Sequence, residues 1–123
     1  MRFTRTSALA ALLACSGLAT PVLADCVYPK TPASAPNGNT ATEEEMLAGV
    51  AAVKTYNAEV DAYLGCLEEE AKKNVAEAGS DTKQVQKIQA VVTKKHDAAV
   101  DELHARADEL NAQIRAYKAK HKS

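Results

Sequence analysis

The chain has 123 residues, with 15 lysines and arginines, 16 aspartates and glutamates, and only 4% aromatic residues. Without residues 1–24, which have the features of an export signal, 13 basic and 16 acidic side chains remain in one small domain. This balance argues against a nucleic-acid-binding protein. The shortage of aromatic residues argues against an aromatic-lined ligand pocket.

Residues 1–24 predict export from the cytoplasm. Arg2 and Arg5 precede a short apolar stretch, and the segment ends in small residues that suit cleavage after Ala24. The stretch is shorter than the about 20 apolar residues that a membrane span requires. Cleavage after Ala24 would start the mature chain at Asp25, and we expect the protein to reside in the periplasm.

The same segment has an alternative interpretation. Leu12-Leu13-Ala14-Cys15 resembles the lipobox of bacterial lipoproteins, in which Cys15 would carry lipid and Ser16 would fit an outer-membrane destination. A membrane is an expected partner only if Cys15 is lipidated, and secretion is a further alternative. Because Cys15 follows Arg5 by ten residues, the hydrophobic region is very short, which favours simple cleavage.

Two cysteines, Cys26 and Cys66, remain in the mature chain and predict one disulfide in an oxidising compartment. They have no C-x-x-C spacing and no neighbouring histidine to act as a base, which argues against a reactive thiol pair. Two cysteines also fill only half of a tetrahedral metal site. The Pro-rich segment 25–41 is long enough, as an extended arm, to run back along the first helix to Cys66.

The rest of the chain predicts an all-α fold, an antiparallel two-helix hairpin that resembles a coiled coil. The first helix spans about 42–78, opens with a capping box of Thr42 and Glu45, and ends at Gly79. The second spans about 81–121. Heptad-like spacing predicts an apolar seam on both helices. The seam comprises Met46, Val50, Val53, Val60, Leu64, Leu67 and Ala71, with Asn57 in a gap, and Val85, Ile88, Val92, His96, Val100, Leu103, Ala107, Leu110, Ile114 and Tyr117.

A second stripe lies beside this seam on the first helix. It comprises Tyr56, Glu59, Tyr63 and Cys66. Because Cys66 belongs to it, we expect the arm to lie along this stripe, with Tyr28 near Tyr63. Charge supports the pairing of the helices, since residues 25–79 carry ten acids and four bases and residues 80–123 carry six acids and nine bases.

Few residues suggest a chemical site. His96, Asp97, Asp101, His104 and Asp108 lie close together on the second helix, and a divalent metal could bind His104 with Asp101 or Asp108. No third or fourth ligand is implied, so a solvated helix face explains the cluster better. His96 is expected to be partly buried in the seam. The basic end from Arg115 suits the helix dipole, although anionic envelope polymers are an alternative partner.

The amino-terminal half resembles a group of small exported helical proteins of Gram-negative bacteria. The resemblance rests on Cys26-Val27-Tyr28-Pro29, Pro36-Asn37-Gly38, Glu45-Met46, Tyr56, Tyr63-Leu64 and Cys66. It implies an exported protein with this cysteine pair, and it implies no activity or catalytic residue. The hairpin shape is also similar to that of periplasmic helical chaperones.

We therefore expect a non-enzymatic periplasmic protein, without a cofactor, that binds a protein or an envelope polymer through its helix faces. The alternative is a metal- or pH-responsive module using His96 and His104, and a chaperone-like hairpin is a third. Helical hairpins of this length often gain stability by further association. A weak homo-oligomer is expected through the apolar flanks Leu47, Val75, Val91 and Ile114.

Overall fold

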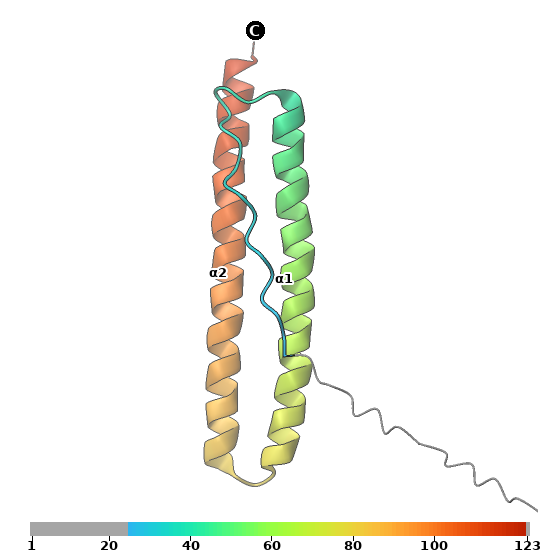
Figure 1. Ribbon diagram of the computed structural model, residues 1–123. Coiled ribbons are helices and arrows are strands. Elements are labelled where there is room, and N and C mark those ends of the chain that lie inside the picture. The colour runs from blue at the N-terminus through green and yellow to red at the C-terminus, as the bar shows by residue number, and fades with distance from the viewer. Residues whose placement is uncertain (1–24, 123) are drawn as a thin grey trace, which may run out of the picture.

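The computed structural model describes residues 25–122 and contains two long helices, α1 (Glu43–Ala78) and α2 (Thr82–Lys120). The helices pack side by side, run in opposite directions and are joined by a tight turn (Figure 1). Residues 25–122 contain no strand. The predicted all-α hairpin is therefore confirmed. The predicted signal 1–24, including Cys15, lies outside the described residues.

Side chains from the sequence motifs start both helices. Thr42 Oγ1 accepts a hydrogen bond from the Glu45 backbone N–H at 3.2 Å, and the Glu45 carboxylate accepts one from the Thr42 N–H at 2.7 Å. Asp81 accepts hydrogen bonds from the backbone N–H groups of Lys83 and Gln84. Thr42 and Asp81 are the cap residues, and each lies one residue before its helix begins. The helices therefore span 43–78 and 82–120, whereas the sequence predicted about 42–78 and 81–121.

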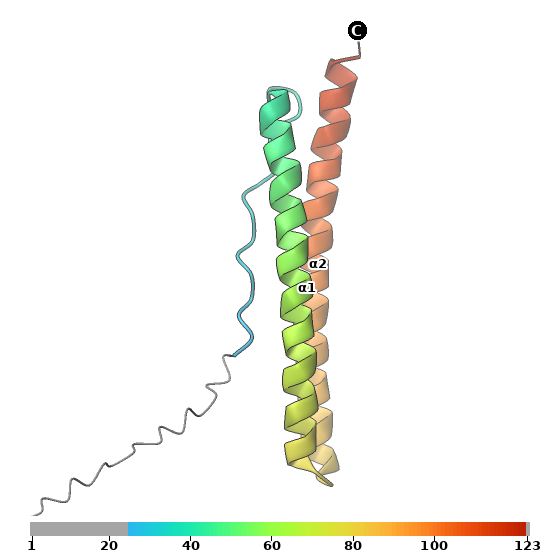
Figure 2. The same ribbon diagram turned by 90° about the vertical axis from the view of Figure 1, so that its right-hand side faces the viewer.

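The arm, residues 25–41, runs back along the hairpin (Figure 1) and contacts both helices on one side. We call the surface between the helices on this side, which the arm covers, the front groove. Cys26 forms a disulfide with Cys66, as expected, with a Cα–Cα distance of 5.7 Å. The Tyr28 ring packs edge-on against Tyr63, with the ring centroids 5.1 Å apart. Figure 2 views the hairpin edge-on and shows the arm on only one side of the helix pair.

The core lies where the two helices and the arm meet. Its main cluster of buried side chains comprises Tyr56, Val60, Tyr63, Leu67 and Ala99. The expectation that the tyrosines flank the core was therefore wrong. The reason is the arm, which packs as a third layer against the side of α1 that carries Tyr56 and Tyr63. These two tyrosines are therefore part of the core.

For the same reason, several residues of the predicted seam are more exposed than expected. Val50 is 41% exposed, and Asn57 is exposed. His96, expected to be partly buried, is also exposed, whereas Ala99, which is not part of the predicted seam, is fully buried.

Gly38 marks a close approach of the arm to α2. A Cβ at this position would overlap the Gln113 carbonyl oxygen and would lie 2.8 Å from the Tyr117 backbone nitrogen. We expect Gly38→Ala to lower the free energy of unfolding by about 1–3 kcal/mol, the usual cost of overpacking. Denaturant unfolding followed by circular dichroism measures this change.

Gly65→Ala is the matched control, because nothing lies within 4 Å of a Cβ at Gly65. That substitution should stabilise α1 by about 1 kcal/mol through helix propensity alone. Equal effects of the two substitutions would contradict the close approach at Gly38.

Candidate functional site

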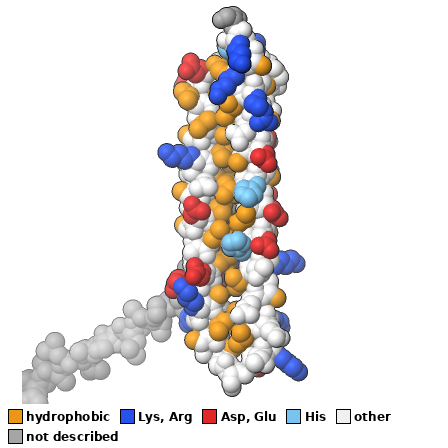
Figure 3. All heavy atoms as spheres, turned by 180° about the vertical axis from the view of Figure 1, so that it is seen from behind, with side chains coloured by type: hydrophobic (Ala, Val, Ile, Leu, Met, Phe, Trp, Pro, Cys, Tyr) orange, Lys and Arg blue, Asp and Glu red, His pale blue; other side chains and the backbone are white. Residues whose placement is uncertain are grey.

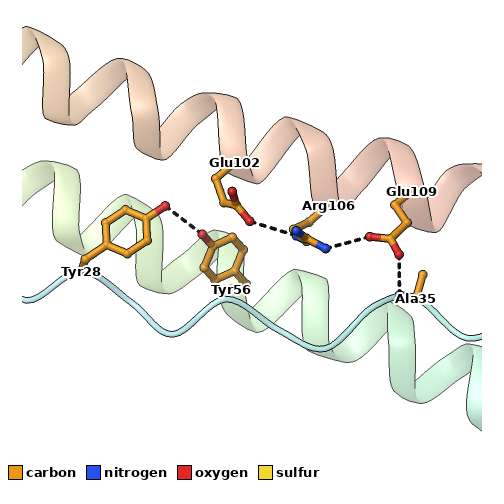
Figure 4. A network of polar contacts seen from close by, with 6 residues as sticks. All are labelled: Tyr28, Ala35, Tyr56, Glu102, Arg106 and Glu109. Carbon is orange, nitrogen blue, oxygen red and sulfur yellow. Dashed lines mark hydrogen bonds and ion pairs between the residues drawn. The ribbon is translucent and has the colours of Figure 1, made fainter.

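Polar groups in the front groove hold the arm in place (Figure 4). The hydroxyl groups of Tyr28 and Tyr56 share a hydrogen bond of 3.0 Å. On α2, Arg106 donates to Glu102 at 3.0 Å and to Glu109 at 2.9 Å. Glu109 also accepts a hydrogen bond from the Ala35 backbone N–H at 3.2 Å. The Arg106 guanidinium therefore orients the carboxylate that binds the arm.

The surroundings of Tyr28 and Arg106 in this network favour their protonated forms. Partial burial, together with the hydrogen bond to Tyr56, raises the pKa of Tyr28. Hydrogen bonding to Glu102 raises the pKa of Arg106. Because the pKa of Tyr28 is higher in the folded state than its unfolded value of about 10, Tyr28 stabilises the fold fully below that pH and loses this contribution as the pH rises further. At neutral pH neither Tyr28 nor Arg106 can accept a proton as a general base.

The carboxyl-terminal turn of α2 holds the other end of the arm. The Gln113 side chain accepts a hydrogen bond from the Gly38 N–H at 2.9 Å. The Lys120 ammonium donates to the Asn39 carbonyl oxygen. His121 stacks on Tyr117, with the ring centroids 4.1 Å apart. The basic end is thus partly engaged within the fold, although the sequence suggested only helix-dipole stabilisation or an external anion.

Sequence reasoning missed the residues of α2 that bind the arm. Glu109 and Gln113 contact groups that are 74 and 75 residues away in the chain. No local motif marks such contacts. The only available signal was the position of both residues, together with Arg106, on one side of the second helix.

The histidine and carboxylate cluster on α2 does not converge on a site. His96, Asp97, Asp101, His104 and Asp108 are all exposed. Their one mutual contact is a 3.2 Å hydrogen bond between His96 Nδ1 and the neighbouring Asp97 carboxylate. Within residues 25–122, no group of three or more His, Cys, Asp or Glu side chains lies close enough together to hold a metal ion.

The side of the hairpin opposite the arm carries an apolar stripe, which we call the back face. Figure 3 shows hydrophobic side chains running along the middle of this face, with acidic and histidine side chains beside them. Six residues define the stripe, because helical spacing puts them on the same sides of the two helices as Leu64 and Val92: Val50, Leu64 and Ala71 of α1, and Val92, Val100 and Leu103 of α2. Leu64 and Leu103 also pack against the core. Val50 is exposed and the other five are half-buried.

A shallow hollow between the two helices lies at the centre of the back face. Asp61, Leu64 and Glu68 line it from α1 at the spacing i, i+3, i+7. The side chains of α1 that contact the arm, Tyr63 and Cys66, point to the other side of the helix. Val92, Thr93 and His96 line the hollow from α2. Predicted seam residues therefore line an open surface.

Neither helix in the described part of the chain combines the length and the apolar character needed to cross a membrane. Comparisons with protein-family models, curated proteins and solved structures find no match to this chain.

Proposed function

We propose that this chain is a non-enzymatic, exported interaction protein that binds a protein partner through its back face. The main support for this proposal is the difference in side-chain exposure between the two faces of the hairpin. The arm fills the front groove and leaves Tyr56 only 1% exposed, whereas Val50 on the back face is 41% exposed. An apolar stripe on both helices that is bordered by charged residues is typical of protein-binding faces.

In this proposal the arm fixes the two helices relative to each other. The disulfide to Cys66 fixes one end, and the hydrogen bond from Gly38 to Gln113 fixes the other. Between them, Glu109 binds the Ala35 backbone N–H. An arm attached along its length holds the two helices at fixed spacing, so the back face is presented as a rigid surface. Pre-organisation of this kind reduces the entropy lost on binding.

We place the protein in the periplasm. The support is the export signal expected over residues 1–24 and a disulfide, Cys26–Cys66, whose two cysteines are both half-exposed. A disulfide that solvent can reach persists best in an oxidising compartment. Mass spectrometry should find a mature chain that begins at Asp25, and an acylated Cys15 would instead show a lipoprotein.

The role of the back face is tested by partner recovery. Tagged protein is crosslinked in its own cell envelope, purified, and compared with the variant Leu64→Glu, which places a charge in the central hollow. We expect Leu64→Glu to reduce recovery of the partner at least about tenfold, because a buried unpaired carboxylate costs more than 1.4 kcal/mol at an interface.

Two controls accompany this measurement. Val27→Glu introduces the same charge on the arm, at a side chain that is 81% exposed, and should leave recovery unchanged. The double variant His104→Ala, Asp108→Ala should also leave recovery unchanged. Loss of recovery in that double variant alone would favour the metal- or pH-responsive alternative and contradict the proposal.

A further inference from the structure

We propose that Asn37 is a spontaneous deamidation site whose reactivity the docked arm suppresses. The site lies in the tip of the arm, residues 37–41, next to the carboxyl-terminal end of α2 (Figure 1). When the tip leaves α2, Asn37 reacts with the backbone nitrogen of Gly38, and the isoaspartyl product prevents the tip from docking again. The site is independent of the back face.

The sequence Asn37-Gly38 is well suited to this reaction, because glycine has no Cβ to shield its backbone nitrogen. The Gly38 nitrogen loses its proton and forms a bond to Asn37 Cγ, and the Cγ–Nδ2 bond breaks to release ammonia, which takes up the proton. Water then opens the resulting succinimide ring at either of its two carbonyl carbons. The products are an aspartyl or an isoaspartyl residue at position 37, and the isoaspartyl form lengthens the main chain by a methylene group.

In the folded chain the attacking nitrogen is protected. Gly38 is buried, and its N–H donates a hydrogen bond of 2.9 Å to Gln113 Oε1. Removal of this proton by hydroxide begins deamidation, as it begins amide hydrogen exchange, and burial with hydrogen bonding slows both processes. The Asn37 side chain is also engaged, since its Oδ1 accepts a hydrogen bond of 2.9 Å from the Asn39 N–H.

Backbone hydrogen bonds restrict the conformation of the tip as well. The Asn37 carbonyl oxygen accepts hydrogen bonds from the Thr40 N–H at 3.0 Å and from the Ala41 N–H at 2.7 Å. Ring closure requires one particular orientation of the Asn37 side chain and of the peptide plane that follows it. A tip held by these bonds samples that orientation rarely, so the reaction proceeds from the undocked tip.

The isoaspartyl product does not fit the docked position. A Cβ on Gly38 would already overlap the Gln113 carbonyl oxygen and lie 2.8 Å from the Tyr117 backbone nitrogen, so α2 leaves no room for a displaced Gly38. The longer main chain displaces Gly38, and the former Asn37 carbonyl becomes a free carboxylate outside the main chain. The tip then stays undocked, while the disulfide to Cys66 still holds the other end of the arm.

Mass spectrometry of the full mature chain with its disulfide intact measures the reaction after incubation at mildly alkaline pH. The native wild type should deamidate at position 37 at least about tenfold more slowly than the same chain in concentrated guanidinium chloride. Gln113→Ala removes the acceptor of the Gly38 N–H and should raise the native rate about fivefold, because a lost hydrogen bond increases the undocked fraction. If Gln113→Ala loses helicity, Lys120→Ala replaces it, because the exposed Lys120 side chain binds the Asn39 carbonyl oxygen.

The chain offers matched controls for this measurement. Asn111→Ala removes an exposed carboxamide from the same region of α2 and should leave the rate at position 37 unchanged. Asn57 and Asn74 lie within α1, are each followed by a residue with a Cβ, and should remain intact while Asn37 reacts. Equal rates for the native and the unfolded wild type, or for the wild type and a folded Gln113→Ala variant, would overturn the proposal.

Amide hydrogen exchange at Gly38 tests whether the product can dock. Wild type aged in guanidinium chloride is refolded, and the isoaspartyl form is isolated by chromatography. We expect its Gly38 N–H to exchange at least about tenfold faster than in the unmodified chain. Asn37→Asp carries the same charge on a main chain of normal length and should retain the protection of the unmodified chain. An isoaspartyl form that is protected like the unmodified chain would overturn the proposed block to docking.

Discussion

Replacing Cys66 with serine is expected to lower the free energy of unfolding by up to about 4 kcal/mol, one of the two largest effects expected for a single substitution in this chain. The disulfide joins residues separated by 40 positions. In the chain-entropy model, opening a loop of this size releases about 4 kcal/mol of unfolded-state entropy. For a domain of about 100 residues this corresponds to a fall in Tm of about 20 °C, which thermal unfolding followed by circular dichroism will measure.

The disulfide prediction has internal controls. Cys26→Ser should give the same loss as Cys66→Ser, and the double variant should add nothing further, because all three remove the same bond. Reductant should lower the Tm of the wild type to that of the variants. An unchanged Tm in strong reductant would contradict a stabilising role for the bond.

Tyr56→Ala is expected to have an effect of similar size, a loss of about 3–5 kcal/mol, which is typical of truncating a buried aromatic side chain. Tyr56 is 1% exposed and belongs to the main core cluster. Its hydroxyl also binds that of Tyr28, so the substitution removes a contact of α1 with the arm as well as core volume. Urea unfolding with a constant m value gives the difference directly.

Two matched variants separate these contributions. Tyr56→Phe keeps the ring and removes only the hydrogen bond to Tyr28, and we expect a cost of about 1 kcal/mol. Asn57→Ala changes the next residue, which is exposed, and should alter stability by less than about 0.5 kcal/mol. If Tyr56→Ala cost no more than Asn57→Ala, the seam as first predicted from heptad spacing would be correct and the observed core wrong.

Local signals in the sequence were sufficient for the helices and their ends. The Thr42–Glu45 capping box and the Asp81 cap involve groups within three residues of each other, so they are readable before any tertiary structure is known. The disulfide was also predictable, because only Cys26 and Cys66 remain once the expected signal is removed.

The side of each helix that faces the core was not predictable from periodicity. Val60 and Leu67 satisfy both the predicted seam and the observed core, so spacing alone could not decide which neighbouring stripe turns inward. The arm decides it, by packing Tyr28 against Tyr63. Contacts between positions so far apart in the chain leave no local pattern. For this reason His96 was expected inside and lies outside.

Only the class of the candidate site, a helix face, was predictable from the sequence. The expectation of a helix-face binding function rested on the lack of a catalytic constellation in the sequence. The particular face depends on where the arm lies, and the sequence suggested other flanks for association, including Leu47 and Val91. These two side chains are exposed, at 62% and 48%, but neither belongs to the six-residue stripe of the back face.

We propose that this protein binds its partner through the back face and not through the arm side. Site-specific photo-crosslinking in the native envelope tests it most directly, with a photoreactive amino acid placed in turn at Val50 on the back face and at Val27 on the arm. Both side chains are exposed, so neither replacement disturbs the core. We predict one discrete adduct from position 50 and none from position 27. Adducts from position 27 with none from position 50 would contradict a binding role for the back face.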